Sequence, residues 1–161
     1  MSMMNSRRSR LLCTTGYEGL TLQNFVRCLK VESIKVLFDI RYRPQSRKPG
    51  FSKAKLSAAC KRAGIKYLHD QKLGTPPDQM AEMRKAGAYS PKLLRKYRAF
   101  LLKQVGSLER AANVVTGAKT CLLCYEADYR GCHRRIVAEE LARLTKIKVN
   151  HLCFYNESPD S

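Results

Sequence analysis

The stretch Ile34-Lys-Val-Leu-Phe-Asp-Ile40 decides the fold class of this 161-residue chain. It is apolar except for Lys35 and Asp39, and it is rich in β-branched residues. A strand that is covered on both faces, as in a parallel sheet, carries such a nearly continuous apolar run. In a strand with one solvent-exposed face, apolar and polar residues alternate instead. The stretch therefore predicts a buried strand in a mainly parallel sheet.

Strand-like and helix-like segments alternate on both sides of this stretch. Alternation of this kind is typical of βαβ units with right-handed crossovers. We therefore expect an α/β fold, a single-domain Rossmann-like three-layer sandwich with a mainly parallel sheet of about five strands. Strands are expected at 11–15, 34–40, 65–69, 119–125 and 146–152, and helices at 21–29, 52–64, 74–87, 90–105 with a second segment to 114, and from 132 or 133.

The same pattern sets the expected domain boundaries. Residues 1–10 are predicted to form a basic flexible N-terminus, 11–153 a single α/β domain, and 154–161 a flexible C-terminal tail. A chain of this length fits one core. Seven cysteines form an odd set, and we find neither a secretory signal nor an apolar run long enough to span a membrane. The expectation is a cytoplasmic protein with free thiols and no membrane partner.

The chain carries 31 Lys and Arg against 13 Asp and Glu, a formal net charge of +18. Such an excess attracts polyanions through counterion release at phosphates. Nucleic acid or a nucleotide is therefore a possible partner. A merely basic surface with no specific ligand remains the alternative, and the sequence leaves cofactors and oligomeric state unknown.

Polar residues follow three of the expected strands. Ligands of parallel α/β sheets collect at the carboxyl ends of the strands, where these residues meet. A basic loop after the second strand mixes cations with aromatic rings, which suits phosphate contacts and base stacking, although a solvated loop has the same composition. The candidates after the first strand are Tyr17 and Glu18, and those after the second strand are Asp39, Arg41, Arg43 and Ser46.

The densest run of reactive residues is Cys124-Tyr-Glu-Ala-Asp-Tyr-Arg-Gly-Cys-His-Arg-Arg135, after the fourth strand. The helix that begins at Cys132 or His133 directs free amides outwards, which favours an anion. The same field and the neighbouring arginines are predicted to lower the pKa of Cys132. His133 could serve as its partner or as a general acid-base.

Four further residues of this run are candidates for charge and proton handling. Arg130 and Arg134 add fixed positive charge, while Glu126 and Asp128 could accept protons, hold arginines or bind a metal. A purely structural interpretation stays open: Asp128 caps a turn, Glu126 pairs with an arginine, and Cys132 packs.

Two short motifs in this region are only weak evidence for a particular chemistry. Cys124-x5-Arg130 matches the spacing of cysteine phosphatases, but the intervening residues include two carboxylates that would repel phosphate. Cys121-x2-Cys124 has the spacing of a zinc or redox pair, but residues three apart in a strand face opposite sides. With no second pair at suitable spacing, no metal site is predicted.

Several ordered motifs together resemble the family called domain of unknown function 488. They are Thr14-Thr-Gly-Tyr-Glu18, Asp39-Ile-Arg-Tyr-Arg-Pro-Gln-Ser46, Pro49-Gly-Phe-Ser52, Leu73-Gly74, and Cys124-Tyr-Glu-Ala-Asp128 followed by Cys132-His-Arg134. The resemblance runs from about Leu11 to Leu152. It implies a compact α/β domain whose motif residues gather at one end of the sheet, without an established activity. Tyr129 stands where the family often has Pro, which affects the shape of that turn.

The resulting hypothesis is an enzyme-like domain that binds a phosphate-bearing ligand, a nucleotide or nucleic acid, at the carboxyl ends of the strands. The alternatives are a non-catalytic nucleic-acid-binding module and a thiol-based redox or sensor protein. The candidate catalytic residues are Cys132, His133, Glu126, Asp39 and Glu18, and the candidate ligand-binding residues are Tyr17, Arg41, Arg43, Ser46, Cys124, Asp128, Arg130 and Arg134.

Overall fold

The computed structural model describes residues 11–157 and contains one five-stranded sheet. Every strand pair in it is parallel, and the strand order is β3-β2-β4-β1-β5. The predicted parallel sheet of about five strands is confirmed. Its strands are β1 (Leu12–Gly16), β2 (Val36–Asp39), β3 (Lys66–His69), β4 (Thr120–Cys124) and β5 (Val149–His151).

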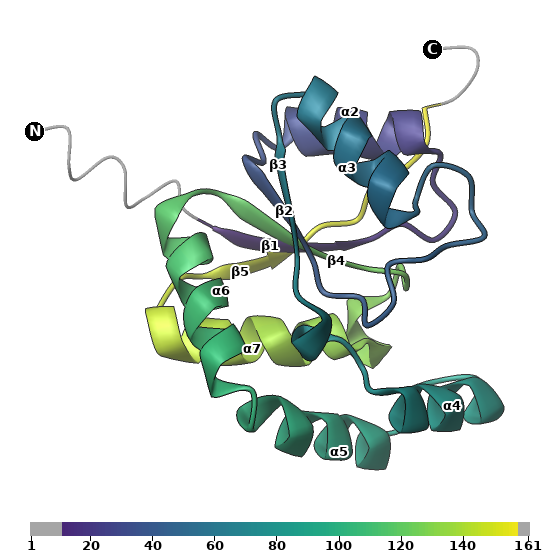
Figure 1. The fold of residues 1–161 in the computed structure, drawn as a ribbon, viewed down its shortest axis with the longest axis vertical. Helices are drawn as coiled ribbons and strands as arrows, with labels where there is room; N and C mark the ends of the chain where they lie inside the picture. The colour runs from purple at the N-terminus through teal and green to yellow at the C-terminus, as the bar shows by residue number, and fades with distance from the viewer. Residues whose placement is uncertain (1–10, 158–161) are drawn as a thin grey trace, which may run out of the picture.

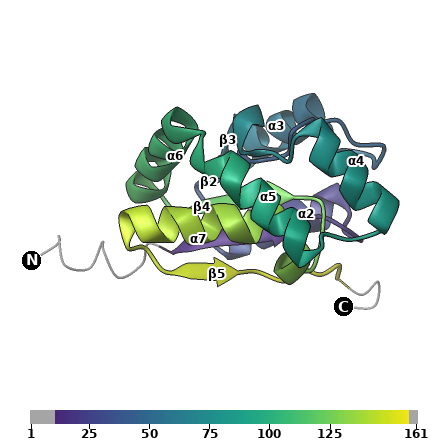
Figure 2. The ribbon, with the colours of Figure 1, turned by 90° about the horizontal axis from the view of Figure 1, so that it is seen from below.

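Helices cover both faces of the sheet, so the predicted three-layer sandwich is also confirmed (Figure 1). One face carries α2 (Leu22–Val31) and α3 (Lys53–Arg62). The opposite face carries α5 (Pro91–Leu102), α6 (Val105–Gly117) and α7 (His133–Thr145), with α4 (Pro77–Ala86) packed beside α5. Figure 2, from below, shows α7 in front of the sheet, where it contacts β1 and β4.

The chain crosses the sheet in two directions, which explains the two helical layers. From β1 it moves through α2, β2 and α3 to β3 at one edge, and then returns through β4 to β5 at the other edge. Right-handed crossovers in opposite directions place their helices on opposite faces. The reversal creates a crevice beyond the carboxyl ends of the central strands, where ligands of such sheets bind.

Alternation along the strands divides the core into two clusters. Leu12, Phe38 and Leu122 point towards α5, α6 and α7. Leu37 and Cys121 point towards α2 and α3. The three central strands are buried along their whole length, as expected for the apolar run of β2.

Among the described residues, two of the six α-helices begin with a side-chain N-cap hydrogen bond. Thr21 accepts a hydrogen bond from the backbone amide of Asn24 at the start of α2, and Ser90 does the same for Leu93 before Pro91 at the start of α5. Ser52 occupies the N-cap position of α3 without a side-chain bond to the helix.

The packed part of the chain continues past the predicted domain end at residue 153. The ring of Phe154 packs against Phe25, and the side chain of Asn156 bonds the backbone amide of Thr21 and the carbonyl of Gly19. The predicted N-terminal segment 1–10 and the last residues 158–161 lie outside the described residues. Among the described helices, none has the length and apolar character needed to cross a bilayer.

Candidate functional site

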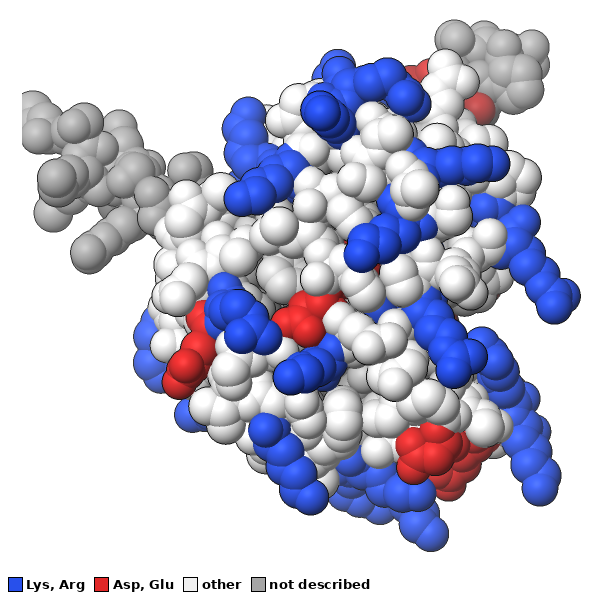
Figure 3. Space-filling model, in the orientation of Figure 1, with Lys and Arg blue, Asp and Glu red and all other residues white. Residues whose placement is uncertain are grey.

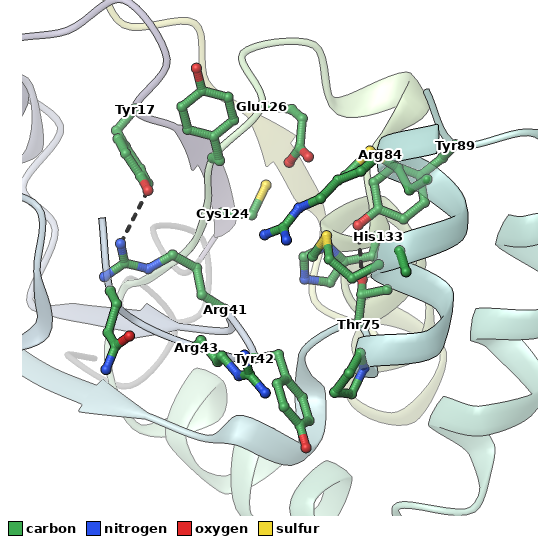
Figure 4. Close-up of a pocket in the computed structure, with 16 residues that line it drawn as sticks. Tyr17, Arg41, Tyr42, Arg43, Thr75, Arg84, Tyr89, Cys124, Glu126 and His133 are labelled. Atoms are coloured by element: carbon green, nitrogen blue, oxygen red, sulfur yellow. Dashed lines mark hydrogen bonds between the residues drawn. The ribbon is translucent and has the colours of Figure 1, made fainter. Parts of the chain in front are cut away.

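A cavity of about 510 Å³ opens at the carboxyl edge of the sheet, between the ends of β1, β2 and β4 and the helix α4 (Figure 4). Its size suits a small organic ligand. In Figure 4, Cys124, Glu126 and His133 face it from the sheet side, and Arg84 reaches across from α4. The lining residues are Tyr17, Arg41, Tyr42, Arg43, Gln45, Thr75, Pro77, Met80, Ala81, Met83, Arg84, Tyr89, Cys124, Tyr125, Glu126 and His133.

A buried ion pair forms one wall. Arg41 donates from Nε and Nη2 to the two carboxylate oxygens of Asp39, at 2.9 and 2.7 Å, and from Nη1 to Tyr17 Oη and the Phe51 carbonyl. Burial alone would lower the pKa of Arg41, but the hydrogen bond and charge of Asp39 raise it. Four of the five guanidinium N–H groups therefore have protein partners, which leaves little of Arg41 for an anion.

Asp39 lies behind the cavity wall rather than in it. Its side chain is buried, and besides Arg41 it accepts a hydrogen bond from Tyr67 Oη. The predicted role of Asp39 as an acid-base group does not fit this position, because its carboxylate is already occupied. Asp39 is better described as a positioning residue that fixes Arg41.

Two glycines allow loops to meet backbone to backbone at the edge of the sheet. A Cβ atom on Gly16 would stand 1.8 Å from the carbonyl oxygen of Glu126, and one on Gly74 would stand 2.2 Å from the backbone nitrogen of Tyr42. The amide of Glu18 also donates to the Tyr125 carbonyl at 2.9 Å. These approaches join the β1 loop to the β4 loop, and the β2 loop to the segment after β3, around the cavity.

A second buried group lies where β4 meets the start of α7. Cys124 Sγ is 2.6 Å from Cys132 Sγ, and Cys132 Sγ is 3.2 Å from Glu126 Oε2. Arg134 donates to Cys124 Sγ at 3.2 Å and also to the backbone carbonyl of Glu126. The sequence run from 124 to 135 thus folds back on itself, and its two cysteines become neighbours.

The predicted low pKa of Cys132 is wrong in direction. Burial raises the pKa of this thiol well above its usual range, and the hydrogen bond and charge of Cys124 with the charge of Glu126 raise it further. Arg134 acts in the opposite sense and is outweighed. The helix start and the arginines are present, but the loss of hydration is the larger effect.

His133 lies against the cavity with a fixed ring orientation. Its Nε2 is 3.1 Å from the carbonyl oxygen of Ile40, which can only accept, so Nε2 carries a proton and donates. Burial lowers the pKa of His133, so the ring is neutral at pH 7 and Nδ1 is an acceptor. That nitrogen lies 3.8 Å from Cys132 Sγ.

Besides the buried Asp39, Cys132 and Arg134, four further predicted site residues do not line the cavity. Glu18 is exposed and accepts from the amide of Ala127, and Ser46 bonds Tyr17 Oη. Asp128 and Arg130 pair with each other on the surface, with Arg130 76% exposed. The phosphatase spacing therefore has no geometric counterpart, because Arg130 does not face Cys124.

The cavity includes residues that the sequence did not point to. Arg84, Met80 and Met83 come from α4, and Tyr89 follows that helix. Tyr125 lies next to a predicted candidate, whereas Tyr42 belongs to the basic loop whose aromatic rings are predicted to suit base stacking. The one available signal was the predicted helix at 74–87, and this prediction does not say which of its side chains face inwards.

The charge of the chain is not concentrated on one element. Figure 3 shows Lys and Arg scattered over the visible face, with acidic residues among them in places. Within the cavity wall the balance is sharper, because three arginines face one carboxylate, Glu126.

A family model described as Domain of unknown function DUF488 matches residues 21–141. The matched range includes the segments around Asp39 and from Cys124 to Arg134, and it leaves Gly16 and Tyr17 outside. No curated protein and no solved structure shows significant similarity to the chain. Since the match covers most of its length, the chain belongs to the DUF488 family of domains of unknown function.

Proposed function

We propose that this protein is an enzyme-like domain that binds a nucleotide in the cavity at the carboxyl edge of the sheet. The observation that carries the proposal is the composition of the wall, in which Arg43 and Arg84 have no partner among residues 11–157 and Tyr42 and Tyr125 are not buried. Arginine recognises phosphate oxygens in a bidentate way, and aromatic rings stack on bases. The same cavity therefore suits both parts of a nucleotide.

The phosphate contacts are assigned to Arg43 and Arg84. Within residues 11–157 neither has a hydrogen bond or an ion pair, and both side chains are exposed. Arg41, in contrast, is held by Asp39 and Tyr17. Two guanidinium groups with no partner among the described residues, one from the loop after β2 and one from α4, favour an anionic ligand in the cavity.

The ring of the ligand is assigned to the apolar part of the wall. Tyr125 is 49% exposed, and Tyr42, Met80 and Met83 are half-buried. Aromatic and thioether side chains pack against flat rings without demanding one particular base. The proposal therefore names a nucleotide as a class and no specific base.

Proton transfer would fall to groups beside the proposed phosphate position. Glu126 and His133 line the cavity, and both can exchange protons. Glu18 and Asp39 are not assigned this role, because Glu18 lies outside the wall and Asp39 is already paired with Arg41. This assignment supports an enzyme-like domain and leaves the reaction unspecified.

The test is equilibrium binding by calorimetry at physiological salt, with ATP, ADP, AMP, adenosine and inorganic phosphate as ligands. We expect ADP or ATP to bind at least tenfold more tightly than adenosine. Arg43→Ala and Arg84→Ala should each weaken nucleotide binding about tenfold, since a charge-assisted hydrogen bond is worth about 1.5–3 kcal/mol. Arg62→Ala, an exposed arginine at the end of α3, is the matched control and should bind as the wild type does.

Equal affinity for adenosine and ADP, or unchanged binding in both Arg43→Ala and Arg84→Ala, would overturn the proposal. The competing nucleic-acid-binding module makes a different prediction. Its affinity for random duplex or single strands would fall steeply with salt, and Arg62→Ala would weaken it as much as Arg43→Ala does.

A further inference from the structure

We propose that Cys124, Glu126 and Cys132 form a binding site for one zinc ion in the cavity wall. Their ligand atoms, two sulfurs and a carboxylate oxygen, all lie within 4.8 Å of one another. Thiolate sulfur and carboxylate oxygen are both ligands that zinc accepts in proteins. The proposed site goes beyond nucleotide binding and stands on its own geometry.

The fold brings these three residues together from separate places. Cys124 is the last residue of β4, Glu126 lies two residues further on, and Cys132 precedes the first turn of α7. Cys121, the other member of the Cys-x2-Cys pair, points to the opposite face of the sheet, into the cluster under α2 and α3. The ligand set is therefore one that strand geometry permits, unlike the pair that the sequence spacing suggested.

One positive charge lies beside the proposed ligand sulfurs. Arg134 Nη1 lies 3.2 Å from Cys124 Sγ, and an N–H donor directed at a metal-bound sulfur is a typical outer contact that tunes such a site. Two thiolates and a carboxylate carry three negative charges, of which Arg134 balances one. A divalent cation would neutralise the remaining two.

Zinc would require a modest rearrangement of the two cysteines. Tetrahedral Zn–S bonds of about 2.3 Å place two sulfur ligands about 3.8 Å apart. The sulfur atoms are 2.6 Å apart, so rotation of one side chain must separate them by about 1.2 Å. The carboxylate oxygen of Glu126, 3.2 Å from Cys132 Sγ, is already close to its place.

The arrangement leaves one position open towards the cavity. Cys124 and Glu126 both line the cavity, whereas Cys132 is fully buried behind them. Three protein ligands and one free position is the pattern of zinc sites that act on substrates, whereas structural sites are closed by four protein ligands.

The test uses Zn²⁺ added to metal-free protein under reducing conditions, in competition with a chromophoric chelator. We expect one zinc per chain, a dissociation constant below about 1 µM, and release of one proton from each thiol that becomes a ligand. Cys124→Ser, Cys132→Ser and Glu126→Gln should each weaken zinc binding at least tenfold. Cys121→Ala and the exposed Cys153→Ser serve as controls and should bind as the wild type does.

Cobalt provides a readout that does not depend on the fold surviving each substitution. Co²⁺ bound by two thiolates in the wild-type protein should show sulfur-to-metal charge-transfer absorption, and the conservative variant Glu126→Gln should keep that absorption while binding more weakly. Arg43→Ala should leave zinc affinity unchanged, so failure of nucleotide binding and failure of zinc binding are distinguishable.

Three outcomes would overturn the site. They are the absence of stoichiometric zinc binding under reducing conditions, binding that persists in both cysteine variants, and a Cys124–Cys132 disulfide that survives the reductant. The last result would assign the pair to thiol redox chemistry instead.

Discussion

The Nη1 atom of Arg134 lies 3.2 Å from the sulfur of Cys124, although the two residues belong to different elements, α7 and β4. The same guanidinium donates to Thr14 Oγ1 at 3.1 Å and to the carbonyl of Ala127 at 3.0 Å. One fully buried cation therefore ties β1, the end of β4 and the following loop to α7. The positions of Cys124 and Glu126 depend on it.

Replacing this cation by lysine should be costly. Arg134→Lys keeps the charge, but a single ammonium group cannot reach Thr14, Cys124 and Ala127 together. Buried acceptors left without a donor cost about 1–3 kcal/mol each, so we expect a loss of about 3 kcal/mol in the free energy of unfolding by urea. Arg135→Lys, at the surface pair with Glu139, should change it by less than about 0.5 kcal/mol. Equal effects of the two substitutions would contradict the anchoring role.

Gly16 should tolerate no side chain. A Cβ atom there would overlap the carbonyl of Glu126, so either the sheet edge or the loop must shift. We expect Gly16→Ala to lower the free energy of unfolding by at least about 2 kcal/mol, as overpacking in a tight site does. Gly117→Ala, with open space at the end of α6, should be neutral or slightly stabilising in the same urea titration. A stable Gly16→Ala protein would mean that the two loops do not meet as described.

The Asp39–Arg41 pair should be far more sensitive than a surface charge. Asp39→Asn leaves the buried guanidinium of Arg41 without its countercharge, and breaking a buried pair costs about 3–5 kcal/mol. Asp78→Asn, in the exposed first turn of α4, is the control and should cost less than about 1 kcal/mol. Chemical denaturation of both variants checks this. A loss of the same small size in Asp39→Asn would show that water reaches the pair.

Stability should fall as the pH drops below about 6.5, the ordinary value for histidine. Burial lowers the pKa of His151, and the charge of Arg134 lowers it further. The unfolded chain then binds more protons than the folded one, so the free energy of unfolding is full above pH 6.5 and declines as the pH falls through the lowered pKa.

The matched variant for this effect is His151→Asn, which keeps a polar partner for Thr14 Oγ1. It should lose some stability at pH 7.5, where the ring stack on Tyr129 is missing, but decline less steeply between pH 7.5 and 5.5. His133 also has a lowered pKa, so part of the slope should persist. If the free energy of unfolding of His151→Asn declines with pH as steeply as that of the wild type, a group other than His151 causes the loss of stability.

The fold could be predicted from the sequence because the order of apolar and polar residues indicates which strands are buried on both faces. The apolar run around Leu37 and Phe38 indicated a strand covered on both faces, and the alternation of strands with helices fixed the parallel arrangement. The extent of the packed chain was harder to predict. The polar Asn156 packs through specific hydrogen bonds that no periodic pattern reveals.

The site could be predicted in outline only. The loops after β1, β2 and β4 meet as the parallel sheet requires, but the sequence does not say which charged groups are buried. Asp39 and Arg134 were expected to contact a ligand, whereas pairing and burial hold them behind the cavity wall. Arg84 was not expected at all, since only the tertiary position of α4 places it in the cavity.

Binding of a nucleotide in the cavity at the carboxyl edge of the sheet is best checked by a crystal structure of the protein with saturating ADP. We expect phosphate oxygens within hydrogen-bond distance of Arg43 or Arg84, and the base against Tyr42 or Tyr125. Nucleotide bound at another surface, with this cavity free of it, would rule out the proposed site.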